Sequence, residues 1–239
     1  MPNHVTSRVT VTGPSADIAA LRDLIITIAP EGHSDAGSPM FSFSAVIPMP
    51  DILMRSEASS HAEMGASLIL YRADRGGPFA DNREYWSKQV RESLDMGSDD
   101  ISDVAAAYLI ANPEVEQKGR TRLEAILETG YANWYPWALA NWGTKWGAYR
   151  YHEIETEADA FVFGFETAWS FPSPIFANLA DRFPALTFDC VCFDEGWNFA
   201  GVGTFGATGE PFAEVKATDE LYEQVYGRKP SRDEDLDDG

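Results

Sequence analysis

Tryptophan is concentrated in one stretch of the chain, and this stretch most constrains the fold. Six of the seven tryptophans in the 239 residues lie between Trp134 and Trp197. Each indole can bury on the order of 150–250 Å² of surface on folding. We therefore expect most of the apolar burial between residues 134 and 206, where the pattern indicates a helix end, a hairpin, a helix and a strand.

Alternation of apolar and polar residues predicts the strands of this protein. Val9 and Val11 alternate with polar residues, and Phe161, Phe163 and Phe165 share one face of a second strand. The predicted strands are 5–12, 149–155, 161–167 and 186–192. A helix after Ser15 with an apolar stripe that includes Ile28 runs to Pro30, a second begins near Ser173 and ends at Pro184, and residues 41–47 form a short strand or extended segment.

The order strand, helix, strand, strand, helix, strand is that of the ferredoxin-like, or split βαβ, fold. We predict an α+β protein with an antiparallel sheet and both helices on one face, over residues 1–50 and 131–215. Helical periodicity over residues 51–130 predicts a helical insertion, in which Leu123, Ile126 and Leu127 form one apolar stripe. Residues 219–239 are predicted to be an acidic, disordered tail.

Several segments resemble the YubB-like family of phage- and plasmid-borne proteins. They lie within residues 1–30 and 131–205, in the same order, and Trp-Gly-Thr-Lys-Trp is the most distinctive. Gly147 departs from the pattern, because relatives more often have a polar residue there. The resemblance implies a ferredoxin-like domain and a mobile-element origin, and it carries over no catalytic residue. The segments are Met1–Thr6, Arg8–Thr10, Asn141–Trp146, Glu166–Trp169, Pro172, Phe183–Pro184 and Glu195–Phe199.

The net charge of −20 bears on the class of partner. A protein surface with this net charge repels nucleic acid unless it also has a local basic patch. The 18 Lys and Arg residues form no dense cluster in the sequence. The charge can serve solubility alone, or it can let the protein compete with nucleic acid for a basic protein surface.

The segment from Asn141 to Trp146 holds the candidate ligand-binding residues Asn141, Trp142, Thr144, Lys145 and Trp146. Two flat aromatic rings, an amide, a hydroxyl and an ammonium within six residues can form a ligand platform. The alternative is structural: the tryptophans fill the junction between helix and sheet, and Lys145 extends to solvent.

Asp194 and Glu195, near a strand end, are the other candidates for ligand or partner binding. Adjacent carboxylates on a strand point to opposite faces, so a solvated pair is favoured over an acid–base pair. His152 has no evident nucleophile beside it. Residues 201–206 fit G-x-G-x-x-G, but turn residues follow them where a dinucleotide site needs a helix. A glycine-rich hairpin is therefore predicted.

Cys190 and Cys192 are expected to be buried free thiols, because a disulfide between residues i and i+2 of a strand has poor geometry. The four histidines show no ligand spacing, so no metal and no cofactor is predicted. No apolar run is long enough for a membrane span, and the first residues lack the pattern of a secretory signal. The expected location is the host cytoplasm.

These observations favour a non-enzymatic protein that binds, and inhibits, a host protein with a basic nucleic-acid-binding surface. A defence complex of the CRISPR type is one such partner, and the helical insertion is the expected contact element. The alternative is an enzyme or binding module that acts on a nucleotide or RNA through the open face of the sheet.

Overall fold

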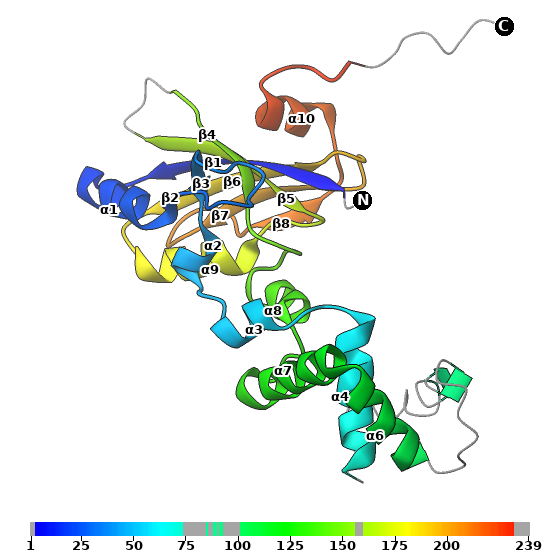
Figure 1. Cartoon of the computed structure of the whole chain (residues 1–239). Helices are drawn as coiled ribbons and strands as arrows, with labels where there is room; N and C mark the ends of the chain where they lie inside the picture. The colour runs from blue at the N-terminus through cyan, green and yellow to red at the C-terminus, as the bar shows by residue number, and fades with distance from the viewer. Residues whose placement is uncertain are drawn as a thin grey trace, which may run out of the picture. The chain divides into compact units, whose positions relative to one another are not determined.

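The computed structural model describes residues 3–73, 85, 88–89, 91–92, 101–155 and 160–231 (Figure 1). The chain divides into two compact units. The sheet unit comprises residues 1–48 and 138–239, and the helical unit comprises residues 49–137. The helical unit begins two residues before the predicted insertion at 51–130 and ends seven residues after it.

The sheet unit contains a six-stranded sheet in the order β4-β5-β1-β6-β7-β8. Every neighbouring pair is antiparallel. The order β4-β5-β1-β6 is that of the ferredoxin-like fold, so the predicted fold class is confirmed. The strands are β1 (His4–Thr12), β4 (Tyr149–Glu153), β5 (Phe161–Ala168), β6 (Thr187–Asp194), β7 (Ala200–Phe205) and β8 (Ala213–Val215).

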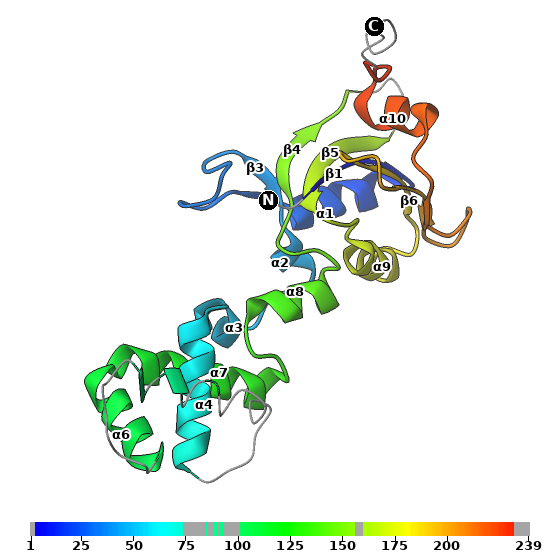
Figure 2. The same ribbon diagram turned by 90° about the vertical axis from the view of Figure 1, so that its right-hand side faces the viewer.

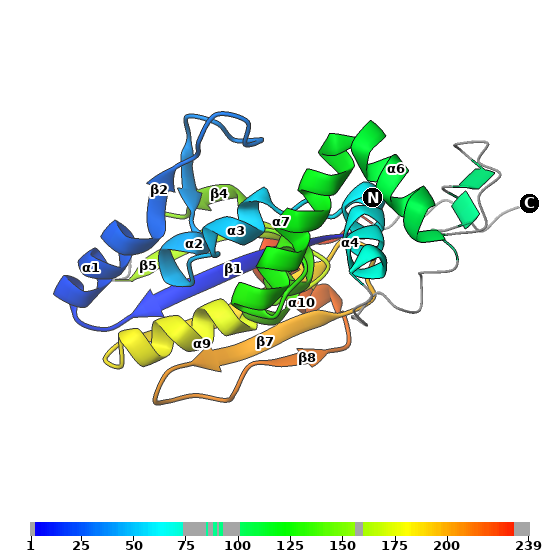
Figure 3. The same cartoon turned by 60° about the horizontal axis from the view of Figure 1, so that its bottom comes forward.

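One face of the sheet is the apolar core of this unit. Val9 lies opposite Phe163 on one side and opposite Cys190 on the other, and all three are buried. Figure 3 shows α1 (Ser15–Ile25), α2 (Phe43–Val46) and α9 (Ser173–Arg182) on this face. Phe176 of α9 stacks on Phe165 with ring centroids 6.2 Å apart. The predicted inner face of β1, β5 and β6 is therefore correct.

The first helix ends earlier than predicted. It stops at Ile25, and Ile26–Ile28 form strand β2, which pairs with β3 (Pro39–Phe41). The predicted burial of Ile28 is wrong, because its side chain is 65% exposed. Three isoleucines and a threonine in succession favour extended backbone, since branching at Cβ restricts χ1 in a helix.

The segment 41–47, predicted to be extended, contains the short helix α2. Ser42 precedes this helix, and its hydroxyl accepts a hydrogen bond from the Ala45 amide at 3.3 Å. A serine at this position stabilises a helix start by satisfying an unpaired backbone amide. Phe41 and Phe43 on either side of Ser42 are both buried in the core.

The open face of the sheet is partly covered by a helix that was not predicted. Residues Asp219–Tyr226, assigned to the acidic tail, form α10. Figure 2 shows α10 on one side of the sheet and α1 and α9 on the other. Val225 packs with the buried side chains of Phe193 and Ala200. The rest of the predicted tail, from residue 232, lies outside the described residues.

The helical unit has an apolar core of its own, from which Leu127 is excluded. Its elements are α3 (Asp51–Arg55), α4 (Ser60–Arg72), α6 (Ile101–Ala111), α7 (Pro113–Thr129) and the first half of α8 (Trp134–Asn141). Leu127 is 86% exposed, so its predicted place in a buried stripe is wrong. The buried residues of α7 are Val115, Gly119, Arg122 and Ala125. The core consists of Met64, Leu68, Val104, Ala105, Leu109 and Val115.

Two glycines set the close approach of α4 and α7. A Cβ atom on Gly119 would lie 2.3 Å from the backbone carbon of Gly65 and 2.4 Å from the amide nitrogen of Ala66. Both contacts are with backbone, which cannot move aside as a flexible side chain can. The close packing of α7 against α4 therefore depends on these glycines.

We predict that Gly119→Ala lowers the free energy of unfolding by about 1–3 kcal/mol, because an overpacked contact forces backbone to shift. The exposed Gln117→Ala on the same helix is the control, and its effect should stay within about 0.5 kcal/mol. Urea denaturation followed by circular dichroism measures both. Equal stability of the two variants would contradict the close packing.

Candidate functional site

The segment Asn141–Trp146 is fixed largely by structural contacts. Trp142 is buried, and its Nε1–H donates to the carbonyl of Ile47 at 2.9 Å. Thr144 is fully buried and donates to the carbonyl of Trp146 at 2.6 Å. Gly143 has a φ of 77°, a conformation that favours glycine. These contacts agree with the structural interpretation of the two inner residues, Trp142 and Thr144.

Lys145 does not simply extend to solvent. Its Nζ lies 4.7 Å from the ring centroid of Trp146 and 4.8 Å from that of Trp169. An ammonium over an indole face is held by the ring's negative quadrupole. Trp169 is 38% exposed and has a φ of 75°. Lys145 therefore fixes two partly exposed indoles in place. Asn141, the remaining candidate of this segment, is the last residue of α8.

Asp194 and Glu195 have separate structural contacts. Asp194 is buried, and its Oδ2 accepts hydrogen bonds from the amide of Asn198 at 3.1 Å and from its Nδ2 at 2.6 Å. Glu195 is exposed, and its Oε1 accepts from the amide of His4 at 2.8 Å. The interpretation of a solvated pair is wrong for Asp194. This carboxylate closes the turn between β6 and β7, since an unpaired buried charge would be costly.

We predict that Asp194→Ala lowers the free energy of unfolding by about 1–3 kcal/mol, because it removes the two charge-assisted hydrogen bonds that close this turn. Glu195→Ala, beside it but exposed, should cost less than about 1 kcal/mol. Chemical denaturation of the two variants provides the comparison. If both lose the same stability, Asp194 does not hold this turn.

A polar network that the sequence did not reveal joins the start of β1 to β4 and β5. Tyr149 Oη lies 2.6 Å from His4 Nδ1 and donates to the carbonyl of Thr167 at 3.1 Å. Glu166 accepts from Arg150 Nη1 at 2.8 Å and lies 3.5 Å from His4 Nδ1. Burial, followed by the nearby Glu166 carboxylate, raises the pKa of Tyr149 to about 12. The phenol is therefore held neutral.

This raised pKa predicts a loss of stability at high pH. Above pH 10 the unfolded chain releases the Tyr149 proton, whereas the folded chain keeps it until about pH 12. The free energy of unfolding should therefore fall as the pH rises through this window. Tyr149→Phe has no such proton and should show a shallower decline in urea titrations at stepped pH. Parallel declines in the two proteins would contradict the network.

The remaining sequence motifs have structural contacts in the sheet unit. Cys190 and Cys192 are free and buried, as predicted, and burial raises the pKa of the Cys192 thiol to about 12. His152 Nδ1 lies 3.1 Å from the carbonyl of Arg150. Gly203 lies in strand β7, where a Cβ atom would meet the Phe212 backbone at 2.5 Å. The predicted glycine-rich hairpin is therefore correct.

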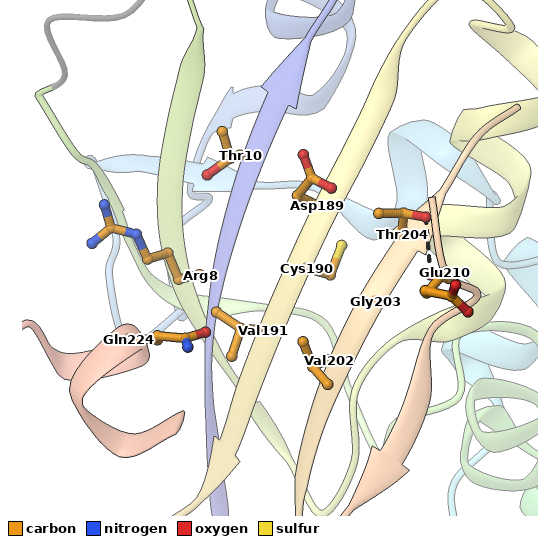
Figure 4. Close-up of a pocket in the computed structure, with 10 residues that line it drawn as sticks. All are labelled: Arg8, Thr10, Asp189, Cys190, Val191, Val202, Gly203, Thr204, Glu210 and Gln224. Carbon is orange, nitrogen blue, oxygen red and sulfur yellow. Dashed lines mark hydrogen bonds between the residues drawn. The ribbon is translucent and has the colours of Figure 1, made fainter. Parts of the chain in front are cut away.

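The open face of the sheet carries a pocket of about 500 Å³ beside α10 (Figure 4). Among the described residues that line it, Arg8 is the one basic side chain, and Asp189 and Glu210 are acidic. Gln224 of α10 closes one side, and the hydroxyl of Thr204 donates to the carbonyl of Glu210 at 3.0 Å. The pocket mixes both signs of charge and offers no aromatic ring for base stacking.

The described residues hold no group of three or more His, Cys, Asp or Glu side chains suited to a metal ion. Within the same part of the chain, no helix has the length and apolar character needed to cross a bilayer.

Helix α10 has sequence signals that could have revealed it. Thr218 accepts a hydrogen bond from the Leu221 amide at 3.3 Å, and Gly227 ends the helix with a φ of 67°. The apolar and aromatic residues 221, 222, 225 and 226 recur at helical spacing. The many charges after residue 219 suggested disorder and concealed this pattern.

Comparison with known proteins supports the fold of the sheet unit. Residues 145–232 match the family model described as the ferredoxin-like domain in Api92-like protein. The matched segment includes α10, so this helix belongs to the domain rather than to a tail. The crystal structure of protein Api92 from Yersinia pseudotuberculosis is similar at 11% identity and a TM-score of 0.41, over 91% of this chain and 99% of that one. No curated protein sequence matches the chain. Residues 145–232 are thus similar to the ferredoxin-like domain of Api92-like protein.

Proposed function

We propose that this chain is a non-enzymatic binding protein whose acidic sheet unit occupies a basic, nucleic-acid-binding surface of a partner protein. The proposal rests on the distribution of charged residues between the two units. In residues 1–48 and 138–239 there are 23 acidic and 9 basic residues, against 15 and 9 in residues 49–137. Most of the net negative charge therefore belongs to the sheet unit. We therefore place the proposed contact element on the sheet unit, whereas the sequence favoured the helical insertion.

The structure of the open face argues against direct binding of nucleic acid. RNA-binding sheets of this topology stack bases on exposed aromatic rings. Here Phe193 is completely buried beneath α10, with its ring 5.3 Å from that of Tyr222. Beside the helix, the open-face pocket sets Asp189 and Glu210 against the single cation of Arg8. Phosphates would meet net repulsion on this surface.

Acidic side chains gather at α10 and at the neighbouring end of β1. Glu220 and Glu223 are exposed on the helix. Glu195 and Glu166 lie close enough to Tyr226 of α10 to raise the pKa of its phenol, although burial is the larger cause. We call Glu195, Glu220 and Glu223 the α10 acidic face. A surface of this kind attracts Arg and Lys side chains and speeds association at low salt.

The finer parts of the proposal rest on the YubB-like resemblance of the sequence. A mobile-element origin would place the protein in the host cytoplasm, where inhibition of a defence complex of the CRISPR type is useful to a phage or plasmid. The competing proposal is a module for a nucleotide or RNA at the open face, and Arg8 in the open-face pocket is the feature that favours it.

We predict that Glu220→Gln/Glu223→Gln weakens partner binding about tenfold at low salt and changes it little at high salt, because long-range attraction is screened. The matched control, Glu124→Gln/Glu128→Gln, removes two exposed acids from the helical unit and should bind like the wild type. The measurement is affinity capture from a host lysate at two salt concentrations, followed by competition with DNA for the captured protein. Capture that is indifferent to salt, or a larger loss in the control, would contradict the proposal.

A further inference from the structure

A second cavity, distinct from the open-face pocket, lies beside the Trp142–Trp146 segment. It has a volume of about 350 Å³ and is formed by three segments of the sheet unit, at residues 32–34, 40–44 and 142–149. Four aromatic side chains line it: Phe43, Trp142, Trp146 and Tyr149. Its size falls within the range of small-molecule sites, which are mostly apolar with a few polar groups.

The aromatic walls are held in place before any ligand arrives. Trp142 is fixed by its hydrogen bond to Ile47 and by an edge contact with Phe43, whose ring centroid is 6.0 Å away. Trp146 is held by Lys145, which does not itself line the cavity. Preorganised walls reduce the entropy lost on binding.

The polar groups of the cavity select an uncharged ligand. Among the described residues that line it there is no Asp, Glu, Lys or Arg. His33 Nδ1 accepts a hydrogen bond from the Asp35 amide at 3.1 Å, so the proton of the neutral ring is on Nε2. The Nε2–H and the hydroxyl of Ser44 supply a donor and a donor–acceptor for the edge of a ring.

Gly147 lines the cavity, and its position has room for a side chain. A Cβ atom on Gly147 would meet no other atom within 4 Å, and its φ is not in the left-handed region. Packing alone therefore does not require glycine here. A larger side chain would fit, although protein interiors otherwise leave few voids.

We propose that this cavity binds an uncharged planar heteroaromatic ring of the nucleobase type, stacked on Trp146. Base–aromatic stacking contributes about 1–3 kcal/mol per ring. Such a ring can come from a free nucleoside or from a base in a single strand. The net charge of −20 opposes a polynucleotide and favours the free nucleoside. This site is independent of the α10 acidic face, so either proposal can fail alone.

The test titrates the protein with adenosine and with uridine while the indole N–H signals are followed by NMR. The Trp146 signal should shift and saturate at millimolar nucleoside or below. Gly147→Leu adds a bulky side chain at the cavity wall without a clash at its Cβ atom, and we expect it to weaken binding at least tenfold. The matched control, Ala19→Leu on the exposed side of α1, should bind like the wild type. Circular dichroism should give the same melting temperature for all three proteins.

A parallel titration with a six-residue oligoadenylate distinguishes the two sources of the ring. If the oligomer binds more tightly than adenosine, and Gly147→Leu abolishes this binding, the ring comes from a single strand. Stronger binding of adenosine would identify a free nucleoside. The proposal is overturned if neither nucleoside nor oligomer shifts the Trp146 signal, or if Gly147→Leu binds both as well as the wild type.

Discussion

The fold of the sheet unit depends on the double pairing of β1. This strand lies between β5 and β6 and is hydrogen-bonded to both along nearly its whole length. Its inward side chains, Val5, Ser7, Val9 and Val11, are all buried. A shift of one residue in register would turn these side chains to the open face and put polar ones into the core. The alternation of β1 therefore specifies the positions of β5, β6 and the helices that cover them.

The same alternation explains how much could be predicted from the sequence. The inner residues of β1, β5 and β6 follow from a period of two, because alternate side chains of a strand face the core. The outer face is less regular, since Val162 of β5 and Phe193 of β6 are buried there as well. Where a short segment carries both helix and strand signals, the sequence does not show which signal prevails. The extended preference of Ile26–Ile28 outweighs the helical stripe, and the capping hydroxyl of Ser42 starts a helix where alternation suggested a strand. Helix α10 was not predicted because its many charged residues suggested disorder.

At the candidate site, residue type alone did not predict which side chains are buried or which ones contact each other. Asp194 and Glu195 are adjacent and chemically alike, yet one is buried in a turn and the other is exposed. The structural interpretation of the segment has Lys145 extending to solvent, but its Nζ lies 4.7 Å and 4.8 Å from the ring centroids of two tryptophans. Trp169, the second of these, is 24 residues further along the chain. Only the fold brings such residues together, so their contacts could not be read from spacing.

The insertion of the helical unit into the sheet unit has a consequence for synthesis on the ribosome. Residues 49–137 make a compact unit from one continuous segment, so they can fold as soon as they emerge. β1 must wait for its partners, since His4 pairs with Ala168 and Val5 with Asp194. At about 5–20 residues per second, this delay is on the order of ten seconds. During that time the nascent chain exposes an unpaired amphipathic strand, so we expect chaperones that bind extended apolar segments to recognise it.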